Sequence, residues 1–113
     1  MTASAEVDAT WTPLLATPPY PDYPSGYNVV TAATARVLTR LFGPDIHLTL
    51  TFTPAGGATV TRSFGHESDV TSAVVEARIW LGIHFRSADV DGVKMGQHAA
   101  NWVLGHAFLP VGG

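Results

Sequence analysis

Residues 24–44, PSGYNVVTAATARVLTRLFGP, set the fold class of this 113-residue chain. Within this stretch, residues 28–42 place apolar side chains at helical spacing along one face. That face consists of Val30, Ala33, Val37 and Leu41. Asn28 is a suitable N-cap, and Gly43 followed by Pro44 is a typical helix end. The stretch therefore predicts a rigid turn followed by a helix.

Two further stretches predict helices. Residues 67–81, ESDVTSAVVEARIWL, have Ser68 or Asp69 as a candidate N-cap and are followed by Gly82, a natural terminator. The predicted apolar side of this helix consists of Val70, Ala73, Val74, Ala77 and Leu81. After a loop, Asp89 or Asp91 is expected to cap a third helix that runs to about residue 106. Its small residues predict one thin side where a neighbour can approach closely, and these are Gly96, Ala99, Ala100 and Gly105.

A β-hairpin is predicted between the first two helices. Residues 46–52, IHLTLTF, alternate strictly between apolar and polar side chains, which is typical of a strand. The turn TPAGG follows, and residues 58–64, ATVTRSF, are a plausible return strand. The predicted fold class is therefore mainly α: a helical-bundle fragment of about three helices with a small β-hairpin between the first and the second.

The segment before the first helix is rich in proline. Five prolines within residues 11–24 exclude a helix and favour a stiff, extended path. Its large side chains indicate that this segment packs on the rest of the chain, and they are Trp11, Leu14, Leu15, Tyr20 and Tyr23. We expect residues 1–10 to be frayed, residues 11–108 to form one helical domain, and residues 109–113 to be a tail.

The composition excludes several classes of function. The net charge is −3 and no run of Lys or Arg occurs, which argues against binding to nucleic acid or to an anionic membrane. The absence of cysteine excludes disulfides, thiol catalysis and thiolate metal sites. No apolar run is long enough to span a membrane, and the start of the chain lacks the features of a secretory signal. We therefore expect a cytoplasmic location by default, or secretion if a longer native chain carries a signal.

Two short segments carry residues suited to binding an anion. Pro24-Ser25-Gly26-Tyr27 offers a hydroxyl group and backbone N–H groups at a helix start, although such a segment alone is usually only a turn with an N-cap. The other segment places Arg78 near the end of the second helix and His84 six residues later, beyond Gly82. A turn at Gly82 would let both side chains converge on one anion.

Together, the two segments resemble the second and third signature motifs of the vanadium-dependent haloperoxidases, within the type 2 phosphatidic acid phosphatase superfamily. Those motifs are P-S-G-H and S-R-x-x-x-G-x-H-x-x-x-D, and this chain reads PSGY at 24–27 and ARIWLGIH at 77–84. The flanking segments are similar to the bacterial, soluble branch. The resemblance covers residues 11–108 and corresponds to the C-terminal part of a full-length family member.

The resemblance implies a role for each matching residue. His84 would bind the vanadium of vanadate as the axial ligand, or would act as the nucleophile in a phosphatase relative. Arg78 would bind the equatorial oxygens, and Ser25 and Gly26 would donate hydrogen bonds to the same oxygens. The implied cofactor is vanadate, with phosphate as the alternative. Peroxide and a halide would be the small-molecule partners of an active enzyme.

The chain also departs from the family pattern. The first motif, K-x-x-x-x-x-x-R-P, is absent, and the only lysine is Lys94. Tyr27 occupies the position of the histidine that moves a proton in the family, and a tyrosine is a poor base at pH 7. Ala77 replaces the serine of the third motif. Asp89 follows His84 by five residues instead of four, so we expect Asp89 to cap the last helix rather than to orient His84.

Three functions stay open at this point. The first is vanadate binding with halide oxidation by hydrogen peroxide, in which His84 and Tyr27 are the candidate catalytic residues. The second is phosphomonoester hydrolysis with His84 as the nucleophile. The third is a non-catalytic structural or assembly fragment, which the absent first motif favours. Because helices of a bundle fragment would leave apolar faces uncovered, we expect a homo-oligomer or a partner segment. An amphipathic stripe on the third helix is expected to be an interface, and it contains Met95, His98, Trp102 and His106.

Overall fold

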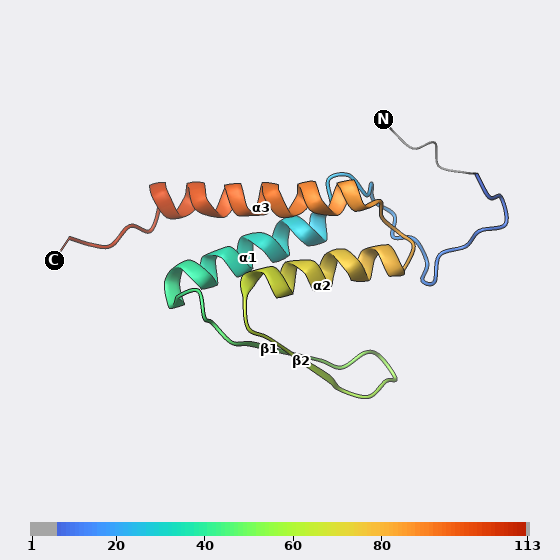
Figure 1. The fold of residues 1–113 in the computed structure, drawn as a ribbon, viewed down its shortest axis with the longest axis horizontal. Coiled ribbons are helices and arrows are strands. Elements are labelled where there is room, and N and C mark those ends of the chain that lie inside the picture. Colours follow the sequence, from blue (N-terminus) through green and yellow to red (C-terminus); the bar gives the residue numbers. More distant parts are fainter. Residues whose placement is uncertain (1–6, 113) are drawn as a thin grey trace.

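The computed structural model describes residues 7–112. It confirms the mainly helical class, with three helices in this range and an antiparallel hairpin between the first and the second (Figure 1). The elements are α1 (Gly26–Phe42), β1 (Leu48–Phe52), β2 (Val60–Phe64), α2 (Glu67–Trp80) and α3 (Arg86–His106). The predictions for the two chain ends concern, in part, residues 1–6 and 113, which lie outside the described range. Within that range, no helix combines the length and the hydrophobicity that a membrane span requires.

Helix α1 begins two residues earlier than predicted. The N-cap is Ser25, whose Oγ accepts the backbone N–H of Asn28 at 3.4 Å, so the prediction of Asn28 as the cap was wrong. A serine three residues before a free N–H is the usual capping geometry, and it leaves Asn28 inside the helix. At the other end, Gly43 adopts a φ of 103° and its N–H binds the carbonyl of Thr39, which ends the helix as predicted.

The buried face of α1 is not the predicted one. Val30 and Leu41 are 66% and 64% exposed, while the buried residues of the helix are Asn28, Ala32 and Ala35. The reason lies in α3, where a Cβ at Gly96 would be only 2.2 Å from the carbonyl oxygen of Val29. Two helices that pack this closely must meet through their small side chains, so the large apolar residues of α1 face outward.

Helix α2 is shifted in a similar way. Its N-cap position is His66 instead of Ser68 or Asp69, and the Asp69 carboxylate accepts the His66 N–H at 3.0 Å. Of the predicted apolar side only Val70 is buried, and the buried residues are Val70, Thr71, Val75 and Arg78. The helix ends at Trp80, one residue before the predicted end, and the predicted terminator Gly82 follows with a φ of +72°.

Helix α3 starts earlier than predicted, at Arg86, and its N-cap position is Phe85. Asp89 therefore lies inside the first turns of the helix and does not cap it, nor does Asp91. The predicted thin side is confirmed at Gly96 and Ala100, which are buried, whereas Gly105 meets no atom within 4 Å.

The hairpin extends away from the three helices (Figure 1). Its register pairs Leu48 with Phe64 and Phe52 with Val60. One face carries hydroxyl pairs, such as Thr49 with Ser63 at 3.1 Å, and the other face carries apolar residues that stay largely exposed. The alternating sequence therefore reflects pairing across the strands and not a buried face.

The proline-rich segment packs against the end of α2, as predicted. The Leu14 N–H donates to the carbonyl of Leu81 at 3.0 Å, and the Trp11 ring occupies the space where a side chain at Gly82 would lie. Leu14 is 77% exposed, so its side chain, unlike its backbone, contributes little to this packing.

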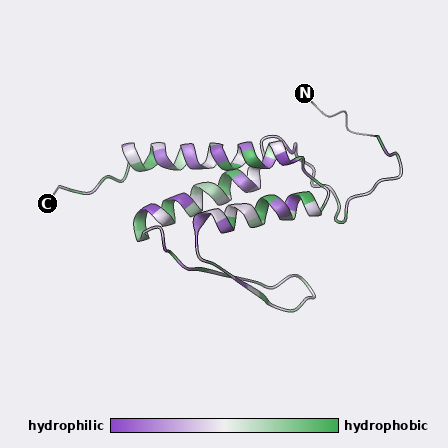
Figure 2. Cartoon of the chain, in the orientation of Figure 1, coloured by the Kyte–Doolittle hydropathy of each residue, from purple (hydrophilic) through white to green (hydrophobic). Residues whose placement is uncertain are grey.

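The chain exposes more surface than a compact protein of its size. Its accessible area is 8349 Å², whereas a folded monomer of 11.9 kDa exposes roughly 6,000 Å². Hydrophobic and hydrophilic residues alternate along all three helices, and none is hydrophobic over its whole length (Figure 2). Much of the apolar surface is therefore not covered within residues 7–112.

Candidate functional site

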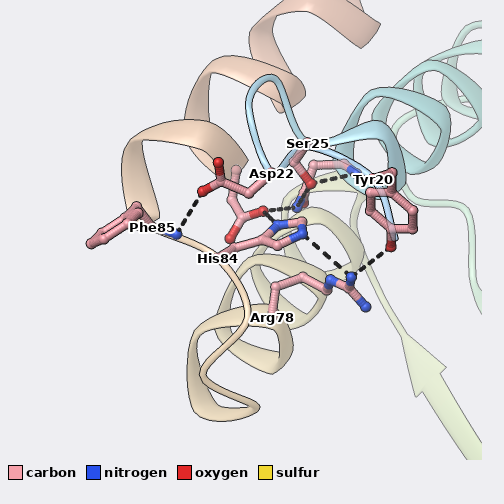
Figure 3. Close-up of polar contacts among 8 residues, drawn as sticks. Tyr20, Asp22, Ser25, Arg78, His84 and Phe85 are labelled. Carbon is pink, nitrogen blue, oxygen red and sulfur yellow. Dashed lines mark hydrogen bonds and ion pairs between the residues drawn. The ribbon is translucent and has the colours of Figure 1, made fainter. Parts of the chain in front are cut away.

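A polar cluster lies where four parts of the chain meet: the proline-rich segment, the start of α1, the end of α2 and the loop before α3 (Figure 3). The sequence-predicted residues Ser25, Arg78 and His84 all contribute side chains to it. Gly26 and Tyr27 lie beside them in the first turn of α1. The structure thus brings together the two segments that the sequence predicted to bind an anion.

Asp89 orients His84. The His84 Nδ1 and Asp89 Oδ1 atoms are 2.6 Å apart, and both side chains are almost completely buried. The prediction that the longer spacing prevents this contact was wrong. Because α3 begins at Arg86 and helical side chains lean toward the N-terminus of their helix, Asp89 reaches back to the preceding loop.

This contact determines which nitrogen of His84 carries the proton. An ionised carboxylate can only accept hydrogen bonds, so Nδ1 is the protonated nitrogen that faces Asp89. The Nε2 atom then keeps its lone pair, and it faces an Nη2 of Arg78 at 3.3 Å. His84 therefore presents an unprotonated nitrogen beside the positive charge of Arg78.

Asn28 is a member of the site that the sequence did not reveal. Its Nδ2 donates to Asp89 Oδ1 at 2.8 Å and to Ser25 Oγ at 3.0 Å, and the residue is fully buried. Asparagine is a common helix cap, so the sequence suggested a capping role for Asn28 and no role in a site. Only the contact between α1 and α3 shows that its amide connects the two ends of the cluster.

Asn28 also leaves Ser25 free to act as a donor. Because Ser25 Oγ accepts hydrogen bonds from Asn28, its own hydrogen is not used in those contacts. The Ser25 N–H donates to the carbonyl of Ala88 at 3.1 Å, which holds the loop against α3. Gly26, the first residue of α1, has one of the N–H groups that no intrahelical carbonyl accepts.

Arg78 is buried despite its charge. Its Nη2 donates to the hydroxyl of Tyr20 at 2.8 Å, and its guanidinium carbon lies 4.4 Å from the centroid of the Tyr27 ring. Its Nε is buried without a hydrogen-bond partner among the described residues. A buried donor without an acceptor is costly, so this N–H is suited to a ligand that can accept it.

Two hollows border the cluster. One has a volume of about 520 Å³ and is lined in part by Trp11, Asp22 and His84. The other has a volume of about 560 Å³ and is lined by Tyr20, Gly26, Tyr27, Val30 and Thr31. Asp22 accepts the N–H of Phe85 at 3.2 Å and so fixes the proline-rich segment to the loop that carries His84.

The residues present fit a tetrahedral oxyanion in type. The Arg78 Nε–H lacks an acceptor, the Ser25 hydroxyl and the Gly26 N–H are donors, and His84 Nε2 is a nitrogen donor of the kind that binds a transition metal. The cationic charge comes from Arg78, because Lys94 is exposed and pairs with Asp91 at 3.3 Å. The cluster thus combines one cation with several hydrogen-bond donors around an oriented imidazole.

The other predicted histidine group forms no comparable cluster. On α3 the Trp102 and His106 rings are stacked with centroids 4.5 Å apart, and Trp102 is 63% exposed. Within residues 7–112, no three or more His, Cys, Asp or Glu side chains are grouped to hold a metal ion.

Comparison with known proteins places the chain in a family. Residues 2–113 match the family model described as the VCPO second helical-bundle domain. The crystal structure of the first bacterial vanadium-dependent iodoperoxidase is 36% identical with a TM-score of 0.74, over 84% of this chain and 23% of that one. No curated protein sequence matches this chain.

Two bacterial vanadium-dependent chloroperoxidase structures are also similar. The holo-type structure is 22% identical and the apo-type structure 24% identical, each with a TM-score of 0.65. The matches cover 81% and 80% of this chain but 22% of each chloroperoxidase chain, and at this identity they show a shared fold. The chain therefore spans less than a quarter of the length of these three proteins.

Proposed function

Because the chain belongs to the family of VCPO second helical-bundle domains, we propose that it binds an oxyanion, with vanadate as the first candidate and phosphate as the alternative. One observation carries this proposal: the buried Arg78 has an Nε–H without an acceptor among the described residues, and its Nη2 lies 3.3 Å from the Nε2 of an oriented His84. Hydrogen-bond donors and a cation around a nitrogen ligand are the set that a tetrahedral oxyanion requires.

Each residue of the cluster has a defined task in this proposal. Arg78 neutralises part of the anion charge and donates hydrogen bonds, and Ser25 and Gly26 donate to the remaining oxygens. Asp89 holds the proton on His84 Nδ1, so the lone pair of Nε2 would be available to hold the oxyanion. Asn28 holds Ser25 and Asp89 in place.

Bound vanadate would supply the peroxide chemistry for halide oxidation, the activity named for the iodoperoxidase and chloroperoxidase relatives. With phosphate or a phosphate ester in the same position, His84 Nε2 would instead be placed as a nucleophile. The second reaction needs a group that protonates the leaving alcohol. Tyr27 is the candidate, because it occupies the position of the family's histidine.

We further propose that the working site includes a second polypeptide, either another copy of this chain or a further segment. A doubly or triply charged oxyanion is poorly neutralised by Arg78 alone, and this chain lacks the Lys and Arg of the first motif. The exposed area of 8349 Å² supports a partner, because it exceeds what a compact monomer of this mass shows. The same observation favours the alternative function, a non-catalytic assembly domain.

The proposal is tested by titrating the protein with orthovanadate and with phosphate in a calorimeter. We expect saturable binding in the parent chain, loss of binding in His84→Ala and Arg78→Ala, and unchanged binding in Arg40→Ala. Arg40 is a matched control because it is an exposed arginine in the last turn of α1, at the other end of that helix. Assays of halide oxidation and phosphate-ester hydrolysis then distinguish the two chemistries.

Absence of binding in the parent chain would contradict the oxyanion proposal and favour the assembly domain. Equal binding by the parent and the Arg78→Ala variant would also contradict it, since the anion would then lie elsewhere. Size-exclusion chromatography with light scattering tests the partner separately, and a clean monomer would count against self-association.

A further inference from the structure

We infer that Tyr27 and Tyr20 are positioning residues that hold the Arg78 guanidinium, Tyr27 through the face of its ring and Tyr20 through its hydroxyl. This inference rests on the proposed anion site and assigns a role to the residue that departs most from the family motif. It adds a contact of the Tyr27 ring, which the geometry displays, to the proton transfer proposed for the Tyr27 hydroxyl.

The contact of Tyr27 with Arg78 involves the ring. The guanidinium carbon lies 4.4 Å from the ring centroid, well inside the range of about 6 Å for an attraction between a cation and an aromatic face. Tyr27 is 56% exposed whereas Arg78 is 9% exposed, so the ring lies on the solvent side of the buried cation. Contact with the face of the ring restricts the movement of the guanidinium.

Tyr20 restricts the remaining rotation. Its hydroxyl accepts a hydrogen bond from Arg78 Nη2 at 2.8 Å, and the same nitrogen faces His84 Nε2 at 3.3 Å (Figure 3). Both contacts thus lie on one end of the guanidinium. The Nε–H, on another edge, is left without an acceptor in the described part of the chain. The two tyrosines therefore fix the plane of the guanidinium and leave a donor free for the ligand.

Sequence position explains how these residues meet. Tyr27 is in the first turn of α1, Tyr20 lies in the proline-rich segment, and Arg78 is near the end of α2. Two separate parts of the chain thus hold a guanidinium that a third part, α2, supplies. Preorganised donors bind an anion better than mobile ones, because less side-chain freedom is lost on binding. The tyrosine that replaces the family's histidine therefore strengthens a cation site that lacks the first motif.

The test compares two substitutions at position 27. Tyr27→Phe keeps the ring and removes the hydroxyl, and we expect its dissociation constant for orthovanadate to stay within about twofold of the parent value. Tyr27→Leu removes the aromatic face, and we expect binding about 2- to 30-fold weaker, the range for such a contact. Because Tyr27 is more than half exposed, both variants should unfold at nearly the parent urea concentration.

A matched pair tests Tyr20. Tyr20→Phe removes the acceptor of the Arg78 hydrogen bond, and we expect orthovanadate binding about 2- to 10-fold weaker. Tyr23→Phe is the control, because Tyr23 is an exposed tyrosine of the same segment whose hydroxyl donates to Asp91 at 3.2 Å instead. Binding by the control should equal that of the parent.

A measurement without ligand separates this inference from the proposed function. The Arg78 side-chain protons over the Tyr27 ring should show an upfield shift in the NMR spectrum of the parent and of Tyr27→Phe, and this shift should disappear in Tyr27→Leu. An unchanged shift in Tyr27→Leu would overturn the inference, as would equally weakened binding in Tyr27→Phe and Tyr27→Leu. A parent chain that shows the shift but binds no anion would overturn the proposed function and leave the contact between Tyr27 and Arg78 in place.

Discussion

The two halves of α3 differ sharply, although they belong to one continuous helix. Residues 86–96 contain four of its five buried residues, which are Ala88, Asp89, Gly92 and Gly96. Residues 97–106 contain the fifth, Ala100. They also include the exposed Trp102 and Gly105, where an added Cβ would have no atom within 4 Å. The buried residues of the first half lie against α1 and the candidate site, whereas most residues of the second half face solvent.

This difference shows which half of α3 contains more of the residues that lower the stability of a helix. A buried carboxylate and two glycines lower the stability of a helix, yet they occur together in the half beside the site. Asp89 also keeps one oxygen, Oδ2, without a partner in the described structure. Features that cost stability and gather at one place are typical of a functional site.

The largest expected effect is the loss of Asp89. Asp89→Ala would leave the His84 Nδ1–H and the Asn28 amide without their acceptor inside the protein. Each unsatisfied buried donor costs about 1–3 kcal/mol, so we expect the free energy of unfolding to fall by roughly 2–6 kcal/mol. Asp89→Asn keeps an oxygen acceptor and removes the buried charge, and its loss should be much smaller, about 1 kcal/mol. Urea unfolding followed by circular dichroism measures both, and equal losses would contradict the role of the lost acceptor.

The next effect compares two glycines of the same helix. Gly96→Ala would place a Cβ 2.2 Å from the Val29 carbonyl oxygen and 3.0 Å from the Ala33 nitrogen, which are backbone atoms that cannot rotate away. We expect a loss of about 1–3 kcal/mol as α1 and α3 separate.

Gly105→Ala is the control in the other half of α3, because its Cβ would meet no atom within 4 Å. Alanine favours a helix over glycine by up to about 1 kcal/mol, so this variant should be unchanged or slightly more stable. Thermal unfolding of the two variants decides the comparison, which fails if both substitutions shift the midpoint in the same direction.

The smallest effect concerns the exposed ion pair at the start of α3. Hydrogen bonds from Arg86 lower the pKa of Glu76 below its ordinary value, with a further contribution from the positive charge of Arg86. Because the pKa is lower in the folded state, the pair stabilises the fold above about pH 4.3, the ordinary value for glutamate. This contribution is lost as the pH falls through the lowered pKa.

Glu76→Gln removes this titration. We expect the parent to be slightly more stable than Glu76→Gln at pH 7, and the two to converge below pH 4. The measurement is the urea midpoint of each protein across this range. A difference between the two proteins that stays constant with pH would show that the Glu76 charge plays no part.

The sequence predicted elements well where the signal is local. Helical spacing, the glycines at 43 and 82, and the alternation in residues 46–52 identified three helices and a hairpin, with most boundaries within two residues. The exception is the start of α3, which lies at Arg86, ahead of both predicted caps. The two motif segments identified Ser25, Arg78 and His84, and the structure brings these three together. The family resemblance drawn from those segments is confirmed by the match over residues 2–113.

The sequence-based prediction of buried residues was wrong where the packing of one helix decides which face of its neighbour is buried. Val30 and Leu41 have the right spacing for a core face, but the glycines of α3 bring the backbones so close that Ala32 and Ala35 are buried instead. A hydrophobic pattern gives the period of a helix, and it does not show how closely the next helix can approach.

The sequence by itself therefore determined the helices, the hairpin and the residue types of the candidate anion site, because these depend on backbone preferences and motifs within a few positions. Tertiary structure alone decided the buried faces, the bridge from Asn28 to Asp89 and the placement of Tyr20 and Tyr27 against Arg78. Those contacts join residues about 50 to 60 positions apart. These contacts form only because of the way α1, α2 and α3 pack, and the spacing of residues within one element does not predict that packing.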